Sequence, residues 1–334
     1  MDESTIGETP LVELPLEVPP TVYAKLEWFN ARDQPYGGGS VKTRIAAAML
    51  DAAAEAGALD DDPTVVEPSS GNTGTAVARI AGERGYDVEI FMPPRPSQAK
   101  VLAIEDAGGT VHRSLTYEQM IEDCADRVAA APDRYYQPDQ YTNPVNPGTH
   151  ALTTGPEVWR QTDGAVTTFV GGIGTGGTVT GVGRALHDAG EVEVVGYEPE
   201  LPSHAISGLH YARGPPFDYP EVFDPSVPDR RPVVDSEAAR RWAARVRERA
   251  ADRELRVHDA GQHDRATVRE HLRVDGQFLV GPSSGGAVAA CHDLATDGHF
   301  DTDDVVVLLF ADRGDRYTSL PNWAAEWIPP RWGR

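Results

Sequence analysis

The chain has 334 residues, 40% of them hydrophobic, and a formal net charge of −22, which is enough sequence for one large or two medium globular domains. A chain with this much negative charge repels nucleic acid and anionic membranes, and neither is therefore expected as a partner. No segment has the pattern of a signal peptide or an apolar run long enough to span a membrane, which predicts a soluble, cytoplasmic protein.

Cysteine and lysine are both scarce in this chain. The two cysteines, Cys124 and Cys291, form no CxxC pair, so their spacing indicates neither a disulfide framework nor a metal site. Only Lys25, Lys42 and Lys100 are lysines, and every other basic residue is arginine. Abundant acid with little lysine favours a salt-adapted, halophilic protein, because dense counterions screen the repulsion between carboxylates. A GC-rich genome that favours arginine codons is the alternative explanation.

Strand-like and helix-like segments alternate through the first half of the chain. The predicted strands are 21–29, 64–68, 88–93, 109–114 and 134–138, and the predicted helices are 41–57, a segment from about 71, 97–107 and 117–131. Short apolar strands separated by helices are typical of parallel sheets covered by helices. The first half is therefore expected to be an α/β domain.

A second series of the same kind follows. Its predicted strands are 167–172, 192–199, 277–281 and 304–312, and its predicted helices are 147–161, 177–188 and 284–295. We therefore expect two α/β domains, residues 1–145 and 146–334, although the first strands could join either sheet. Residues 202–232 are rich in proline and aromatic residues and break the alternation, which predicts a long ordered loop at a cleft or an interface.

One glycine-rich loop, 171–181, lies between a predicted strand and a predicted helix. Gly172, Gly174 and Gly177 fit the GxGxxG spacing of dinucleotide-binding enzymes, and Glu198 ends the next strand. More broadly, free backbone N–H groups at a helix start form a cradle for any phosphate ester. The cradle residues are Gly174, Thr175, Gly176, Gly177 and Thr178.

Lys42 stands at the start of a predicted helix, directly after a run of glycines and a serine. The positive end of the helix dipole and partial burial both disfavour its ammonium form. A lysine that loses its proton easily suits Schiff-base chemistry. Together with a phosphate cradle, Lys42 indicates pyridoxal 5'-phosphate as the cofactor.

Two further loops gain a role beside that cofactor. The loop of Ser69, Ser70, Gly71, Asn72 and Thr73 offers amide and hydroxyl donors that suit the α-carboxylate of an amino acid. Asn72 could also donate to the phenolic oxygen of the cofactor ring. Ser283 or Ser284, at another helix start, could reach the nitrogen of the pyridine ring.

The same loops carry a family resemblance that runs through nearly the whole chain. It covers IGETPLVEL, GGSVKTR, VVEPSSGNTGTAVA, QYTNPVNPGTHALTTGPEVW, GGIGTGGTVTGVGRAL, GYEPE, GPSSGGAVAA and ADRGDRY. In this ordered set the chain resembles the cysteine synthase and cystathionine β-synthase family of fold-type II pyridoxal-phosphate enzymes. The resemblance implies two doubly wound, three-layer α/β domains with mostly parallel sheets, the tryptophan-synthase-β-like fold, assembled as a homodimer.

The resemblance also implies a role for each loop. Lys42 would bind the cofactor as an internal aldimine and then remove the Cα proton of the substrate. Gly174, Thr175, Gly176, Gly177 and Thr178 would hold the cofactor phosphate, and Ser283 would bond the pyridine nitrogen. The carboxylate loop of Ser69, Ser70, Gly71, Asn72 and Thr73, with Gln140, would bind the substrate.

The activity implied is the synthesis of L-cysteine from O-acetylserine and sulfide through an α-aminoacrylate. A neutral serine beside the pyridine nitrogen favours loss of a β substituent over transamination. An O-phosphoserine-using cysteine synthase, with Arg231 or Arg230 pairing with the substrate phosphate, is one alternative, and a cystathionine β-synthase-like enzyme is another. An NAD-dependent dehydrogenase would explain Glu198 but not Lys42, and a non-catalytic homologue would not need to keep Lys42.

Overall fold

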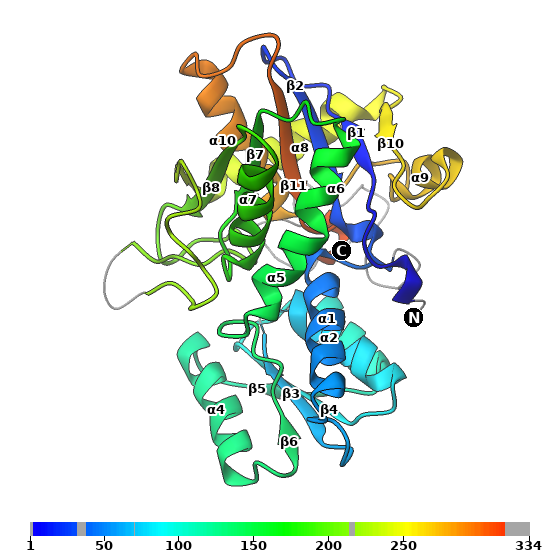
Figure 1. The fold of residues 1–334 in the computed structure, drawn as a ribbon, viewed down its shortest axis with the longest axis vertical. Coiled ribbons are helices and arrows are strands. Elements are labelled where there is room, and N and C mark those ends of the chain that lie inside the picture. Colours follow the sequence, from blue (N-terminus) through cyan, green and yellow to red (C-terminus); the bar gives the residue numbers. More distant parts are fainter. Residues whose placement is uncertain (1–2, 32–37, 70, 214–217, 318–334) are drawn as a thin grey trace, which may run out of the picture.

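The computed structural model describes residues 3–31, 38–69, 71–213 and 218–317, which form two sheets (Figure 1). The larger sheet has the strand order β10-β1-β2-β11-β7-β8-β9, and the smaller has the order β5-β4-β3-β6. The strands are β1 Leu11–Glu13, β2 Thr21–Leu26, β3 Thr64–Pro68, β4 Val88–Met92, β5 Thr110–Arg113, β6 Tyr135–Tyr136, β7 Thr168–Gly172, β8 Glu193–Pro199, β9 Val233–Val234, β10 Val257–Asp259 and β11 Val305–Phe310.

Ten α-helices of the described residues cover these sheets. They are α1 Val41–Glu55, α2 Asn72–Glu83, α3 Gln98–Asp106, α4 Tyr117–Ala130, α5 Val145–Leu152, α6 Thr154–Gln161, α7 Gly177–Ala189, α8 Ser236–Ala251, α9 Arg265–His271 and α10 Pro282–Thr296. Short 3-10 helices occupy Glu3–Thr5, Glu27–Phe29 and Gly314–Tyr317, the last labelled η3. No helix in the described part of the chain is both long and apolar enough to cross a bilayer.

The larger sheet has helices on both faces. Along β11, Val306, Leu308 and Phe310 pack in one core cluster with residues of α8 and α10. Val307 and Leu309 point the other way, into a cluster with residues of α6 and α7. Successive side chains of a strand face opposite sides, so β11 lies in the middle of three layers.

The smaller sheet repeats this arrangement. Val65 of β3 and Ile90 of β4 pack against residues of α1 and α2, whereas Val66 and Phe91 pack on the other face against Met120 and Cys124 of α4. All of its strand pairs are parallel. The predicted α/β class, with two doubly wound and mostly parallel sheets, is confirmed.

The first two strands do not belong with the smaller sheet. Strand β2 pairs in parallel with β11 from Thr21 to Leu26, and β1 is antiparallel to both β2 and β10. Strands β1 and β2 therefore lie in the larger sheet with strands of the second half, which is one of the two placements that the sequence left open. The smaller sheet itself lies wholly before residue 145.

Several segments differ from the sequence prediction. Residues 277–281 form only isolated bridges, Val274 to Gln277 and Val280 to Arg313, because an apolar run requires burial but not pairing in a sheet. The segment 147–161 forms two helices, α5 and α6, which separate at Thr153. Helix α8 was missed, although its Trp242 and Val246 are buried in the core.

Helix α5 lies in the middle of the molecule, between the larger sheet above and the smaller sheet below, and α1 runs downward from there along the smaller sheet (Figure 1). The loop after β3 leads into α2, and the loop after β7 leads into α7. Ligands of α/β proteins bind at such carboxyl ends of parallel strands. The fold therefore directs both glycine-rich loops toward the region around the start of α1.

Candidate active site

Lys42 lies in the first turn of α1, and its position is fixed by a capping box. The Ser40 hydroxyl accepts a hydrogen bond from the Lys42 backbone N–H at 3.2 Å, and the Ser40 N–H donates to the Thr43 hydroxyl at 3.1 Å. Such reciprocal caps satisfy the free N–H groups at a helix start. The sequence GGSVKT therefore forms the local structure that presents the lysine.

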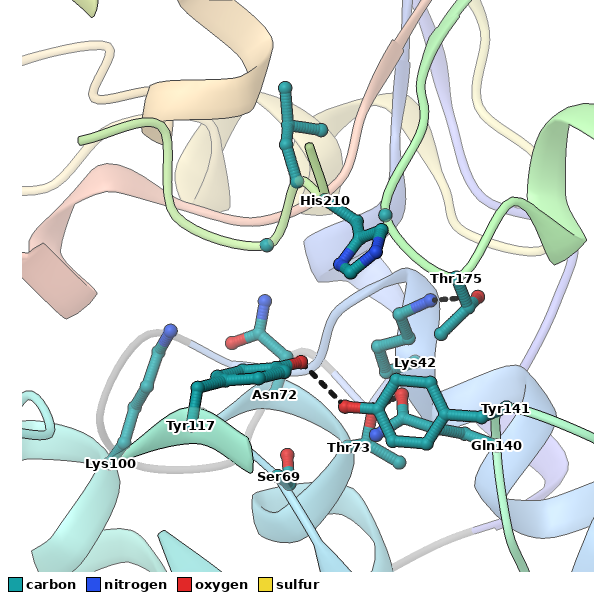
Figure 2. A pocket seen from close by; sticks show the side chains of 13 residues that line it. Lys42, Ser69, Asn72, Thr73, Lys100, Tyr117, Gln140, Tyr141, Thr175 and His210 are labelled. Atoms are coloured by element: carbon teal, nitrogen blue, oxygen red, sulfur yellow. Dashed lines mark hydrogen bonds between the residues drawn. The ribbon is translucent and has the colours of Figure 1, made fainter. Parts of the chain in front are cut away.

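Burial changes the chemistry of the Lys42 side chain. Its Nζ lies 3.4 Å from the Thr175 hydroxyl oxygen in the loop after β7, as Figure 2 shows. Desolvation lowers the pKa of Lys42 to about 8, because the ammonium form loses the stabilisation of water. About a tenth of the side chains are then neutral, nucleophilic amines near pH 7, far more than for a solvated lysine.

Lys42 stands where two neighbouring cavities meet. The first, which we name the Ser283 cavity, is lined by Val41, Lys42, Asn72, Gly172, Gly174, Thr175, Gly176, Thr178, Tyr197, Ser207, Gly208, Leu209, Ser283, Leu309 and Ala311. The second, the Gln140 cavity, is lined by Lys42, Ser69, Asn72, Thr73, Lys100, Tyr117, Gln140, Tyr141, Gly174, Thr175, Gly208, Leu209 and His210 (Figure 2). Lys42 can therefore serve a ligand in either cavity.

The glycine-rich loop before α7 forms a cradle at the helix start. Gly176 has a φ of +83°, a conformation that glycine adopts without strain. The Thr178 hydroxyl is held by the Nε2 atom of His150 at 3.1 Å. Burial keeps the pKa of His150 well below its usual value, so this imidazole is neutral. It therefore positions the Thr178 hydroxyl by a hydrogen bond and adds no charge of its own to the cradle.

Gly174 is the glycine of this loop with the tightest backbone neighbour. A Cβ added there would lie 2.1 Å from the carbonyl oxygen of Gly208, so one of the two chains must move. We expect Gly174→Ala to weaken cofactor binding by about ten-fold or more, measured as the dissociation constant by fluorescence titration. Gly148→Ala is the matched control, because nothing lies within 4 Å of that Cβ; equal affinity of the two variants would contradict this prediction.

The carboxylate loop after β3 is tied to the segment that carries Gln140. The Thr73 hydroxyl donates to Gln140 Oε1 at 2.6 Å, and Gln140 Nε2 donates to the Pro68 carbonyl at 3.2 Å. Glu67 accepts hydrogen bonds from the backbone N–H groups of Asp139 and Gln140. Burial raises the pKa of Glu67 to about 8. The structure thus brings together the loop and Gln140, which are far apart in sequence.

Asn72 and Ser283 were both predicted to contact the cofactor, and both line the Ser283 cavity. The Asn72 amide donates to Asp312 Oδ2 at 2.7 Å and accepts from Arg316 at 3.1 Å, so neighbouring side chains fix its orientation. The Ser283 carbonyl accepts a hydrogen bond from the Tyr197 hydroxyl. That bond holds the start of α10 beside the cavity.

Other predicted residues lie elsewhere. Gly71 is the N-cap of α2 and Gly177 begins α7, and neither lines the two cavities. Ser70 lies outside the described residues. Arg231 is 3.8 Å from Glu198 and donates to the Tyr219 hydroxyl at 3.2 Å; it lines neither cavity, and its proposed contact with a substrate phosphate remains a prediction.

Four polar side chains that line the Gln140 cavity were given no role from the sequence: Lys100, Tyr117, Tyr141 and His210. The two tyrosine hydroxyls are 2.7 Å apart (Figure 2). A usable signal existed for two of the four, because Lys100 and Tyr117 lie in the first turns of helices that follow strands of the smaller sheet, where ligands of α/β folds bind. The scarcity of lysine also marked Lys100.

Comparison with known proteins decides the family. The profile of the pyridoxal-phosphate dependent enzymes matches residues 3–312. A cysteine synthase of Aquifex aeolicus (strain VF5) is 35% identical over 323 residues, which cover 93% of this chain and 88% of the relative. The chain belongs to the cysteine synthase family of fold-type II pyridoxal-phosphate enzymes.

Other members of the cysteine synthase family agree with this placement. Cysteine synthase B of Escherichia coli (strain K12) is 36% identical over 323 residues, which cover 95% of this chain and 94% of the relative. Among solved structures, O-ureido-L-serine synthase superposes with a TM-score of 0.78 at 29% identity, covering 98% of this chain and 97% of the other. The cofactor predicted from the sequence, pyridoxal phosphate, is confirmed by this membership.

The residues of the two cavities fit this cofactor. The start of α7, with its neighbouring threonine hydroxyls, suits a phosphate ester, and Lys42 is the only lysine that lines the Ser283 cavity among the described residues. Ser283, at the start of α10, offers a neutral hydroxyl for a ring nitrogen. The donor set therefore matches a phosphorylated pyridine aldehyde.

Proposed function

We propose that this chain catalyses a β-replacement in which O-acetylserine, an activated serine, reacts with sulfide to give L-cysteine. The observation that carries the proposal is the position of Lys42 between a phosphate cradle and a loop of carboxylate donors. The cysteine synthases among the relatives support L-cysteine as the product. In this reaction the Cβ–O bond breaks, acetate leaves and a Cβ–S bond forms, so that the three-carbon amino-acid unit is transferred to sulfide.

Lys42 has two duties in this proposal. Pyridoxal phosphate, when bound, draws electrons from the Cα of an amino acid, so that the Cα proton becomes acidic and a β substituent can leave. Lys42 would hold the cofactor covalently, accept the Cα proton at Nζ and return it after sulfide has added. Its pKa of about 8 suits both duties, because only a neutral amine can attack the aldehyde or accept a proton.

The remaining residues of the site would bind and orient the substrate and the cofactor. Thr73 and Gln140 would bind the substrate α-carboxylate together with the start of α2, and their own hydrogen bond keeps both side chains in place. Gly174 to Thr178 would bind the cofactor phosphate. Ser283, an uncharged partner for the ring nitrogen, would leave that nitrogen less protonated than a carboxylate would. Loss of the β substituent is then favoured over transamination.

Other donors and nucleophiles stay as alternatives. The similarity to O-ureido-L-serine synthase favours a second candidate, in which the nucleophile adds an O-ureido group to the same three-carbon unit. O-phosphoserine as donor and homocysteine as nucleophile are the further alternatives inferred from the sequence. All of them use Lys42 in the same way and differ only in what enters or leaves at Cβ.

The decisive experiment measures cysteine production by the purified holoenzyme in molar salt. O-acetyl-L-serine, O-phospho-L-serine and L-serine are each supplied with sulfide, and the product is quantified by chromatography. We expect cysteine from O-acetyl-L-serine and none from the Lys42→Ala variant. If cysteine forms from O-phospho-L-serine and not from the other two donors, O-phospho-L-serine replaces O-acetyl-L-serine as the donor in this proposal. If no amino-acid product forms from any donor, the proposal is contradicted.

Homodimerisation, a cytoplasmic location and salt adaptation also remain proposals. The net charge of −22 supports the last, because self-repulsion of this size destabilises a folded chain unless salt screens it. The assay above is therefore run in high salt.

A further inference from the structure

None of the three lysines of this chain is exposed, and each has a different environment. Lys25 is fully buried and its Nζ forms an ion pair with Glu157 at 2.7 Å. Lys42 lies between the two cavities. Lys100, in the first turn of α3, is only 4% exposed yet lines the Gln140 cavity, and the proposed function gives it no role.

Lys100 has no carboxylate partner among the described residues. Its Nζ is 3.4 Å from the Tyr317 hydroxyl and 4.6 Å from the centre of that ring. Burying an ammonium group without an opposite charge is costly. A hydroxyl and an aromatic face offset only part of that cost.

The charges around Lys100 do not balance. The carboxylate of Asp312 stabilises the charged form of Lys100, whereas the guanidinium of Arg316, which is also buried, destabilises it. Asp312 Oδ2 already accepts hydrogen bonds from Asn72 and from the Tyr317 hydroxyl. Arg313 and Asp315 also act on Arg316, but they pair with each other at 2.9 Å and cancel. Two buried cations and one buried carboxylate therefore leave one positive charge at the cavity wall.

This unbalanced charge lies beside the carboxylate loop. Gly71 packs directly on the Lys100 side chain, so that a Cβ there would be 2.1 Å from Lys100 Cδ and 2.8 Å from its Nζ. Figure 2 shows Lys100 and Lys42 on opposite sides of Asn72. The loop supplies hydroxyl and amide donors but no charge of its own.

We propose that Lys100 is a substrate-binding residue whose ammonium group pairs with the α-carboxylate of the amino-acid substrate. The inference rests on the proposed function and deepens it. The neutral donors of the carboxylate loop orient the anion, and Lys100 supplies the opposite charge. The substrate in turn balances a cation that the protein leaves without a carboxylate.

The test compares the holoenzyme with its Lys100→Met and Lys100→Arg variants. Equilibrium binding of L-serine, L-serinamide and O-phospho-L-serine is measured by calorimetry. L-serinamide lacks the carboxylate charge and is the matched ligand. We expect Lys100→Met to weaken L-serine binding by about 10- to 100-fold, the range of a charge-assisted hydrogen bond. L-serinamide binding should stay unchanged, and Lys100→Arg should recover most of the loss.

Thermal unfolding supplies a second readout. Lys100→Met removes an unpaired buried charge, so its unfolding temperature without ligand should equal or exceed that of the wild type. Lys25→Met makes the same change at a paired lysine and should lower that temperature. A lower unfolding temperature for Lys100→Met, with equal losses for L-serine and L-serinamide, would show a structural role and overturn the proposal.

The remaining outcomes separate this proposal from the proposed function. If the wild type binds L-serine and Lys100→Met binds it equally well, the inference about Lys100 fails alone. If only O-phospho-L-serine binding is weakened, Lys100 pairs with a phosphate at Cβ, and the assignment to the α-carboxylate is wrong. If the wild type binds none of the three ligands, the proposed function fails and this inference fails with it.

Discussion

Replacing Lys42 with alanine is expected to abolish covalent attachment of pyridoxal phosphate and to lower turnover by about 10³-fold or more. The physical reason is that no other lysine lines the Ser283 cavity in the described part of the chain. Attachment is measured as the mass of the intact protein after borohydride reduction, and turnover as cysteine formed. Lys42→Arg is the control, because it keeps a positive charge but cannot form an imine.

The pH dependence of attachment tests the same residue without mutation. Burial lowers the pKa of Lys42 to about 8, so about half of the side chains are neutral at pH 8, compared with less than about 1% for a solvated lysine. A base whose pKa is lowered in the folded state loses its proton earlier as the pH rises. The attachment rate of cofactor-free protein should therefore rise up to about pH 8 and then level off. A rate that keeps rising steeply to pH 10, or full retention of the adduct in Lys42→Ala, would contradict the assignment.

Replacing Arg44 with methionine should cause the largest loss of stability among single changes near the site. Arg44 Nε lies 2.7 Å from Glu27 Oε2, and its Nη1 lies 2.6 Å from Glu157 Oε1. Lys25 completes this buried group of two cations and two carboxylates. Although burial alone would raise it, the pKa of Glu157 is held well below its usual value by Lys25 and Arg44.

Removal of Arg44 leaves two buried carboxylates with one cation. Breaking a buried pair in this way costs about 3–5 kcal/mol, and because Arg44 lies in α1 two residues after Lys42, cofactor binding should weaken too. Guanidinium chloride unfolding followed by tryptophan fluorescence measures the loss. The matched control is Arg160→Met, since Arg160 forms an exposed pair with Glu8 that contributes less than about 1 kcal/mol. Similar losses for the two variants would contradict the buried-charge explanation.

Local features made much of the fold and of the site predictable. The strand-to-helix loops around Thr73 and Gly174 were located correctly from their glycine, serine and threonine residues. These residue types suit the backbone conformation and the capping hydrogen bonds of a helix start, and both depend only on residues nearby in the chain. Lys42 was identified for the same reason, since its place depends on Ser40 two residues before it. The family membership inferred from these loops is confirmed.

Features that depend on distant partners were not predictable in this way. The sequence of β2 is compatible with either sheet, and only its pairing with β11, nearly 300 residues later in the chain, decided which one it joined. The apolar segment 277–281 was predicted as a strand because burial and pairing leave the same pattern in the sequence.

The sequence by itself therefore determined the type of chemistry, because an amine at a capped helix start and a glycine-rich cradle are local structures. Only the tertiary structure decided the electrostatics of the site. Whether a buried charge such as that of Lys25 or Lys100 is compensated depends on which side chains the fold brings within a few ångströms. Glu157 pairs with Lys25 across more than 130 residues, whereas no carboxylate of the described residues forms an ion pair with Lys100, and Asp312, the acid that acts on it, is shared with Arg316.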